Sequence, residues 1–308
     1  MVFFPMNRNS SFKKTRLAPT PSGYLHLGNV LSFAITAFLA KQAGAKILLR
    51  IDDVDRERTE EKYVQDIFDT LNFLEIPWHE GPRSVAEFTG TYSQLCRMDL
   101  YNNALRQLRE AGHLFACNCS RSQIAAINAD SSYPGTCSDK KLSLDSENVS
   151  WRLRTDDRVL ILKSLNEGLI ETRLPQHMRD FVVRKRDGFP AYQLTSLVDD
   201  LHFGVDLIVR GEDLRASTLA QLYLSRLLAG NDFASCVFYH HLLLTDEKGE
   251  KLSKTAGDIS VNYLRRAGKS KEEVYGIIGA WLQAKGPVRD YHALAQIALQ
   301  IGEHFTDM

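Results

Sequence analysis

Residues 14–51 read KTRLAPTPSGYLHLGNVLSFAITAFLAKQAGAKILLRI. Within them, Thr15–Ala18 predicts a short strand, which ends at the Pro- and Gly-rich turn of residues 19–23. Apolar residues then recur at helical spacing until Gly44, a suitable C-cap, and Lys46–Ile51 predicts a buried strand. Strand, turn, helix and strand make a βαβ unit, so we expect an α/β fold with a parallel sheet.

The rest of the chain continues this pattern around an irregular middle. We expect helices at 59–71, 93–111 and 217–228, strands at 205–209 and 238–244, a hairpin at 181–194, and helical structure near the C-terminus. Residues 117–150 are rich in Ser, Asn and Asp, which indicates an inserted module. The expected division is a tail at 1–12, a main domain at 13–112 and 180–245, the module at 113–179, and a loop with a helical segment at 246–308.

Composition limits the classes of protein. The 308 residues are 44% hydrophobic and 25% charged, as in an ordinary globular protein, and the formal net charge of zero argues against a broad nucleic-acid coat. No apolar stretch is long enough to span a membrane, and the apolar N-terminus is too short for a signal peptide. Three of the five cysteines are clustered, which favours a metal site in a reducing compartment. We therefore expect a cytoplasmic monomer with no membrane partner.

The turn at residues 19–29 is a candidate phosphate-binding site. A helix N-terminus presents unpaired N–H groups and a positive dipole, and glycine lets the backbone approach a nucleotide closely. His26 lies where its ring could donate to a phosphate. A single histidine at a helix start is more often structural, so a functional interpretation of this motif needs a second motif elsewhere in the chain. The ATP-binding candidates here are Pro19, Gly23, His26, Gly28 and Asn29.

The second motif is GEKLSKT at residues 249–255. A glycine-bearing loop with Lys251 and Lys254 could stabilise the charge that moves onto a departing pyrophosphate. Alone, such a loop is more simply a solvated charged surface. The two motifs in this order, the second about 225 residues after the first, indicate adenylate formation from ATP, with Lys254 a further ATP contact.

The sequence resembles the glutamyl branch of the class I aminoacyl-tRNA synthetases over residues 14–260. The matching stretches are RLAPTPSGYLHLGN at 16–29, LRIDDVD at 49–55, AYQL at 191–194, IVRGEDL at 208–214 and the 249–255 loop. The resemblance implies a Rossmann-like nucleotide-binding domain with an inserted zinc-containing module and a short helical C-terminal segment. It also implies that His26 and Lys254 are catalytic, that Lys251 assists, and that ATP binds with magnesium.

The chain ends 53 residues after Thr255, too soon for a large anticodon-binding region. It is therefore most similar to members that lack this region, which attach L-glutamate to queuosine in the anticodon of tRNA(Asp). Three alternatives remain: a glutamate ligase with another acceptor, such as the tRNA 3′ end or a protein amine; a non-catalytic tRNA-binding paralogue; and another nucleotidyltransferase.

The resemblance also supplies glutamate-binding positions, namely Arg16, Ala18, Thr20, Asp52, Tyr192 and Arg210. Arginine binds carboxylates through paired hydrogen bonds, so Arg16 and Arg210 should each take one carboxylate, in an order left open. Asp52 matches the position that binds the ammonium group, where the branch usually has the longer Glu. Arg210 favours glutamate over glutamine, because an amide would leave its charge unmatched.

The clustered cysteines match the zinc pattern of the branch, which consists of three cysteines and a tyrosine. The ligands would be Cys117, Cys119, Tyr133 and Cys137, and structural zinc is usually four-coordinate. The alternatives are reduced cysteines in a loop and a Tyr133 that packs in the turn at residues 132–135.

Overall fold

The computed structural model describes residues 12–130, 132–244 and 260–306, with side chains up to residue 302. The expected βαβ unit is confirmed. It consists of β1 (Lys14–Leu17), α1 (Leu27–Ala43) and β2 (Lys46–Leu49), with the two strands parallel and adjacent. Gly44 ends α1 in the left-handed region at φ 66°, where its missing Cβ avoids a steric cost.

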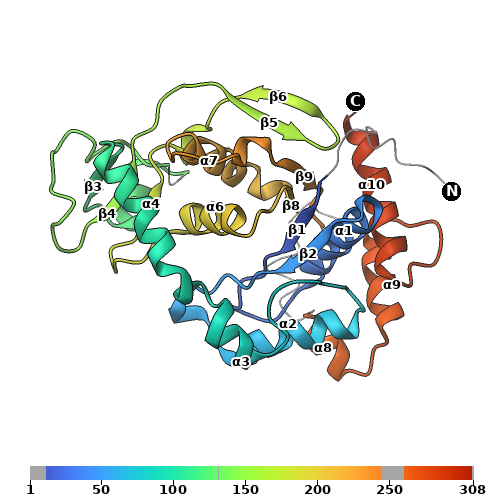
Figure 1. The fold of residues 1–308 in the computed structure, drawn as a ribbon. Helices are drawn as coiled ribbons and strands as arrows, with labels where there is room; N and C mark the ends of the chain where they lie inside the picture. Colours follow the sequence, from blue (N-terminus) through green and yellow to red (C-terminus); the bar gives the residue numbers. More distant parts are fainter. Residues whose placement is uncertain (1–11, 131, 245–259, 307–308) are drawn as a thin grey trace.

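The main sheet has the order β2-β1-β8-β9-β5-β6 and is mostly parallel (Figure 1). Its further strands are β5 (Leu160–Ser164), β6 (Gly168–Thr172), β8 (Leu207–Gly211) and β9 (Val237–His241). β8 pairs in parallel with β1 and β9, and β5 with β9, whereas the edge strand β6 is antiparallel to β5. The predicted α/β fold with a parallel sheet is therefore confirmed.

Helices cover both faces of this sheet. Leu207 and Val209 belong to one apolar core and the intervening Ile208 to the other, as the twofold alternation of a strand requires. The first core includes α1, α2 (Glu61–Phe73), α8 (Val261–Arg266), α9 (Lys271–Trp281) and α10 (Tyr291–Thr306). The second includes α4 (Met98–Glu110), α6 (Tyr192–His202) and α7 (Arg215–Ser225).

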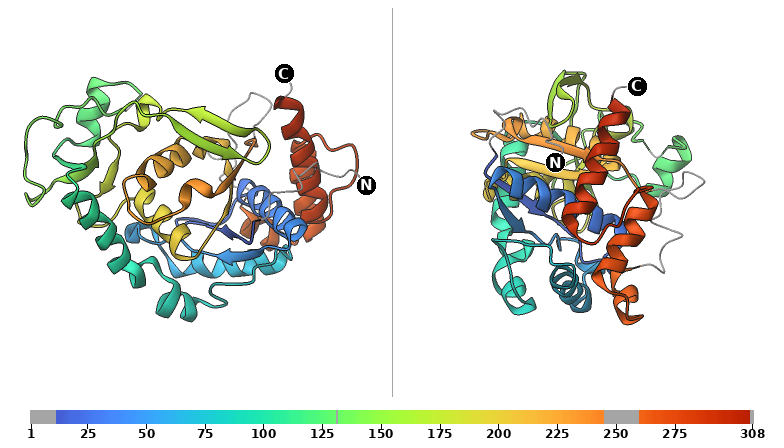
Figure 2. Two further views of the ribbon diagram at one scale, coloured as in Figure 1. Left: turned by 45° about the horizontal axis from the view of Figure 1, so that its top comes forward. Right: turned by 90° about the vertical axis from the view of Figure 1, so that its right-hand side faces the viewer.

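A second, antiparallel sheet lies at the opposite end of the molecule from α9 and α10 (Figures 1 and 2). It consists of β3 (Leu114–Cys117), β4 (Ser150–Leu153) and β7 (Val182–Arg184), and α5 (Arg121–Ile127) follows β3. β5 and β6 belong to the main sheet, although they lie within residues 113–179 of the expected module. β7 belongs to the second sheet, although it lies within residues 180–245 of the expected main domain. The change of sheet therefore does not coincide with residue 179. The domain division remains a prediction.

Several local expectations need correction. The second arm of the 181–194 hairpin is not a strand: it makes one bridge, Arg184 to Pro190, and α6 begins at Tyr192. Two helix starts also differ from the prediction. The 59–71 helix begins at Glu61, while the Thr59 hydroxyl donates to Asp55 O at 3.3 Å, and the 217–228 helix begins at Arg215, so Ser217 lies inside α7. Short helical turns occupy residues 56–58, 85–87, 88–92, 94–97, 176–178, 212–214 and 233–235.

The C-terminal segment is helical as expected, from α8 to α10. No helix within residues 12–130, 132–244 and 260–306 combines the length and the apolar character needed to cross a membrane.

Candidate active site

A cavity of about 470 Å³ lies where β1, β8 and β9 end and α1 begins. Ligands of open α/β sheets bind at such carboxyl ends of strands. The residues predicted to bind ATP or glutamate that fall in the described part of the chain all line it: Arg16, Ala18, Pro19, Thr20, Gly23, His26, Gly28, Asn29, Asp52, Tyr192 and Arg210. Lys251 and Lys254 lie outside the described residues.

The N-terminus of α1 forms one end of the cavity. His26 is the N-cap: its Nδ1 accepts from Asn29 N–H at 3.3 Å, and its own N–H donates to Asn29 Oδ1 at 3.0 Å. An accepting Nδ1 leaves the proton of a neutral imidazole on Nε2, so Nε2 is the ring nitrogen that can donate. A Cβ at Gly28 would lie 3.0 Å from the His26 ring. Glycine there lets the ring cap the helix, and the helix dipole favours an anion.

The described residues that flank the segment with Lys251 and Lys254 lie at this cavity or against His26. Leu244, the last described residue before it, lines the cavity. Ser260, the first one after it, pairs with His26 in an antiparallel bridge, and Val261 N–H donates to Leu25 O at 2.8 Å. The described residues on both sides of the segment 245–259 therefore lie at this cavity or against His26, whereas the 249–255 motif itself lies outside the described residues.

The other end of the cavity holds buried ion pairs. Arg50 binds both Asp52 oxygens, from Nε at 2.7 Å and Nη2 at 2.9 Å, and its Nη1 lies 2.6 Å from Asp200 Oδ1. Arg16 reaches the same Asp200 oxygen at 3.2 Å and donates to Val209 O at 3.1 Å. Burial raises the pKa of Asp52, and the Arg50 charge opposes that rise. Asp200 thus holds two guanidinium groups in place.

Arg210 differs from these arginines because it has no carboxylate hydrogen-bond partner in the described part of the chain. It is 3% exposed, and only Nη1 is bonded, to Thr218 Oγ1 at 3.3 Å and Gln221 Oε1 at 3.1 Å. Among the described residues its Nε and Nη2 find no hydrogen-bond acceptor. Burial, followed by the Arg16 charge, lowers its pKa to about 10, so it stays cationic at neutral pH. A buried cation of this kind is costly without an anion.

The charges at this end fit a dicarboxylic amino acid. Three buried guanidinium groups (Arg16, Arg50 and Arg210) lie near the buried carboxylates Asp52 and Asp200. Asp199 also approaches Arg50, at 4.0 Å, but Arg97 matches its charge, so one positive charge remains in excess. A ligand with two carboxylates and one ammonium carries the opposite net charge. Arg50 and Asp200 were missed in the sequence, although Arg50 stands beside Asp52 in a quoted motif.

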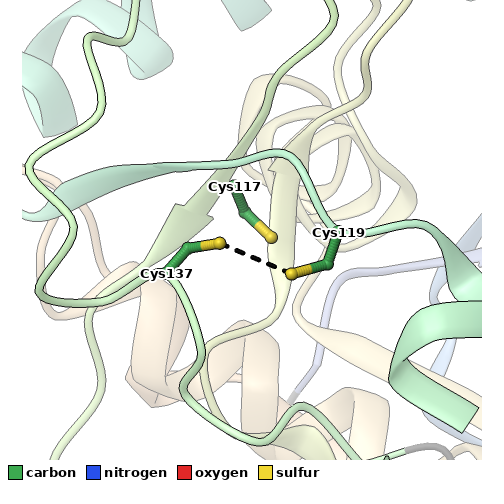
Figure 3. A group of neighbouring side chains, drawn as sticks. All are labelled: Cys117, Cys119 and Cys137. Carbon is green, nitrogen blue, oxygen red and sulfur yellow. Dashed lines mark hydrogen bonds between the residues drawn. The ribbon is translucent and has the colours of Figure 1, made fainter. Parts of the chain in front are cut away.

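The three clustered cysteines converge in the antiparallel sheet region. Cys117 ends β3, and the Sγ atoms of Cys117, Cys119 and Cys137 all lie within 4.8 Å of one another, with Cys119 and Cys137 at 3.4 Å (Figure 3). Zn–S bonds of about 2.3 Å in a tetrahedron require sulfur atoms about 3.8 Å apart. The spacing of the thiols therefore fits a bound zinc ion.

Tyr133, the predicted fourth ligand, lies beside the cysteine cluster. Its hydroxyl accepts from Cys137 N–H at 2.8 Å, and the Arg152 guanidinium lies 3.8 Å from its ring centre. Burial raises the pKa of the Cys117 thiol, but hydrogen bonds from Cys119 N–H, Tyr133 and Arg152 bring it down to about 7. Burial and the neighbouring Cys137 thiol raise the pKa of Cys119 to about 11. A thiolate is the form that binds metal, so Cys117 is the thiol whose surroundings favour that form.

Comparison with known proteins agrees with this geometry. Residues 13–279 match the class I tRNA synthetases (E and Q), catalytic domain. The chain is 36% identical over 276 residues to a glutamyl-Q tRNA(Asp) synthetase of Symbiobacterium thermophilum, covering 85% of this chain and 84% of that protein. A glutamyl-Q tRNA(Asp) synthetase of Nitratidesulfovibrio vulgaris is 33% identical over 282 residues, with 85% and 84% covered.

Longer relatives extend beyond this chain. It is 29% identical over 302 residues to glutamate–tRNA ligase 2 of Syntrophus aciditrophicus, covering 94% of this chain but 61% of that protein. The crystal structure of a glutamate–tRNA synthetase from Elizabethkingia anophelis has the same fold, with a TM-score of 0.66 and 23% identity over 80% of this chain and 53% of that one. The chain therefore belongs to the family of class I tRNA synthetases of the E and Q type, through their catalytic domain, and so to a family of ligases.

Proposed function

We propose that this chain activates L-glutamate with ATP and transfers the glutamyl group to queuosine in the anticodon of tRNA(Asp). The observation that carries the glutamate assignment is Arg210, a buried cation that lines the cavity and lacks a carboxylate hydrogen-bond partner among the described residues. A neutral amide in the place of a carboxylate would leave that charge uncompensated.

In the first step, a glutamate α-carboxylate oxygen attacks the α-phosphorus of ATP. A new P–O bond forms, the bond to the leaving pyrophosphate breaks, and glutamyl-adenylate results. Arg16 and Arg210 bind the two carboxylates, and Asp52 binds the ammonium. The protein acts mainly by positioning the reactants and stabilising developing charge.

Phosphate binding belongs to the other end of the cavity. His26 donates from Nε2, and the turn with Gly23, Gly28 and Asn29 admits the nucleotide. Lys254, assisted by Lys251, stabilises the departing pyrophosphate. Magnesium bound with ATP would supply further charge neutralisation on the phosphates. The α1 dipole and the described boundaries of the lysine segment beside His26 support this assignment.

In the second step, an acceptor hydroxyl attacks the carbonyl carbon of the adenylate, an ester forms and AMP leaves. The queuosine acceptor is supported by relatives named glutamyl-Q tRNA(Asp) synthetase, to which the chain is 33% and 36% identical. A base that enters such a site has to leave the anticodon stack, which favours a single-stranded loop as substrate.

The activation step is tested by glutamate-dependent exchange of pyrophosphate into ATP without tRNA. We expect exchange with glutamate and none with glutamine or aspartate. Absence of exchange with glutamate, both with and without tRNA, would exclude the ligase and leave the tRNA-binding paralogue.

The acceptor is tested separately with labelled glutamate and two tRNA(Asp) preparations, one with queuosine and one without. We expect labelling of the first only, and its survival after removal of the tRNA 3′ end. Loss of the label together with the 3′ end would show that the acceptor is the tRNA 3′ end and not queuosine.

We also propose that Cys117, Cys119, Tyr133 and Cys137 bind structural zinc. Elemental analysis of freshly purified protein should give one zinc per chain. Cys137→Ser should lower both the zinc content and the thermal midpoint, since a structural site stabilises the folded state. Protein with four intact ligands but no zinc would refute this assignment.

A further inference from the structure

Asp66 is a buried carboxylate outside the cavity that joins three segments of the chain. It is 2% exposed and lies on α2 between apolar residues of the core-facing side. Its Oδ2 accepts from Leu25 N–H at 3.3 Å, and its Oδ1 accepts from Asn262 Nδ2 and Arg265 Nη2, each at 3.0 Å. Each of these donors is at least 41 positions away in the sequence.

The donors lie on the two segments that meet at the nucleotide end of the cavity. Leu25 directly precedes His26, the N-cap of α1, and its own carbonyl accepts from Val261 N–H at 2.8 Å. Asn262 and Arg265 belong to α8, which begins directly after Ser260, the bridge partner of His26. One carboxylate therefore ties the His26 turn to the first described helix after the lysine segment.

A buried carboxylate at this position is costly compared with an apolar residue, and only its partners compensate for the cost. Its ion pair with Arg265 and its two further hydrogen bonds are directional, whereas apolar packing alone would leave the angle between α2, α8 and the turn less defined. Such buried charges are best known for fixing the register of packed elements.

We propose that Asp66 is a positioning residue, which holds α8 against the His26 turn and so keeps the N-terminus of α1 in place for the ATP phosphates. The proposal rests on the proposed function, because it assigns ATP to this end of the cavity. Asp66 itself does not contact the substrate, since it does not line the cavity.

The test is Asp66→Asn, measured by glutamate-dependent ATP–pyrophosphate exchange. An asparagine amide N–H would face either Leu25 N–H or the donors of α8, so one set of contacts is lost at almost constant volume. We expect the KM for ATP to rise about tenfold, as for the loss of one charge-assisted bond, with the KM for glutamate unchanged. Partial unfolding alone would lower kcat and change neither KM.

Asp69→Asn is the matched control. Asp69 lies on the same helix but its side chain is 44% exposed, and it meets Arg265 only at 3.6 Å. This variant should keep the wild-type KM for ATP. If Asp66→Asn does not fold, Asn262→Ala removes one donor from the other side and should raise the KM for ATP in the same selective way.

An unchanged KM for ATP in the folded variant, or an equal rise in both KM values, would overturn the positioning role. Wild-type protein that shows no glutamate-dependent exchange would instead contradict the proposed function, so the two failures are distinguishable.

Discussion

The two ends of the cavity are built in different ways. The end with Arg16, Arg50 and Arg210 consists of side-chain charges that are at most 7% exposed, counting their partners Asp52 and Asp200. The end at the start of α1 consists of backbone N–H groups, half-exposed glycines and an exposed histidine. The first end relies on charged side chains in a medium of low polarity, and the second relies on a helix terminus.

This difference determines what each end needs from the rest of the fold. A buried guanidinium keeps its place only if carboxylates and carbonyls from several elements hold it, as Asp200 on α6 holds Arg16 from β1. A helix N-terminus is formed by one local segment and its cap. We therefore expect substitutions at the buried end to change glutamate binding, and substitutions at the helix end to change the handling of ATP.

The largest expected effect is that of Arg210→Met. Methionine keeps the length of the side chain but removes its charge, so a carboxylate of glutamate loses its buried partner. Truncating one member of a buried charge pair costs about 2–5 kcal/mol, so kcat/KM for glutamate should fall by about two to three orders of magnitude. Steady-state exchange at varied glutamate concentration measures this.

The same variant should lose little stability, because the lost cation made hydrogen bonds only to the neutral groups of Thr218 and Gln221 and lacked a carboxylate partner within the described chain. Arg50→Met is the matched control. Arg50 is equally buried but holds Asp52 and Asp200, and breaking such pairs costs about 3–5 kcal/mol. The Arg50 variant should lose far more thermal stability than the Arg210 variant by calorimetry. Equal losses in both would mean that Arg210 is structural and would remove the distinction between the arginines.

Lys254→Ala tests the other end. If this lysine stabilises the departing pyrophosphate, its loss should lower kcat for exchange by about two orders of magnitude, as for one preorganised charge-stabilising donor. The KM for glutamate should not change, because the glutamate-binding end is intact. Lys248→Ala, close in sequence but outside the KLSKT motif, is the control and should behave as wild type. An unchanged kcat would mean that the loop has been assigned the wrong role.

Asp200→Asn should have a smaller effect, of about tenfold on the KM for glutamate. The substitution keeps the size of the side chain but removes the charge that holds Arg16 at 3.2 Å and Arg50 at 2.6 Å. Because Asp200 is fully buried, the thermal midpoint should fall as well. Exchange kinetics and calorimetry on one preparation would measure both changes. A rise in the KM for ATP instead would contradict the assignment of glutamate to the buried end and ATP to the helix end of the cavity.

The fold was predictable where the signals are local. The βαβ unit of residues 14–49 follows from a turn, a helix that ends at Gly44 and two short apolar strands. β5 and β6 were not predicted in the main sheet, because β5 pairs with β9 across more than 70 positions of sequence and β6 joins the sheet only through β5. The 189–194 stretch was predicted as a strand but continues into α6, since local apolar content does not distinguish a short strand from a helix start.

The residues that line the cavity could be predicted from the sequence, but the contacts that hold them in place could not. The residue positions taken from the family resemblance, as far as they are described, share one cavity. Asp200 was not predicted, because in the sequence it is one of two adjacent acids in a helix, and only the fold brings it to Arg50, 150 residues away. Asp66 was missed for the same reason, since its helical pattern alone suggests a solvent-facing acid.

The smallest effect we predict is that of Gly28→Ala at the helix end. The added Cβ would lie 3.0 Å from Cε1 and Nδ1 of His26, tighter than ordinary contact, so the ring has to shift and its hydrogen bond with Asn29 lengthens. A lost N-cap costs about 0.5–2 kcal/mol, so the KM for ATP should rise by about threefold to tenfold. Gly23→Ala, whose Cβ would meet nothing within 4 Å, is the control for the added methyl group alone. If both variants behave alike, the methyl group acts by blocking the nucleotide, and the capping role of His26 contributes nothing to ATP binding.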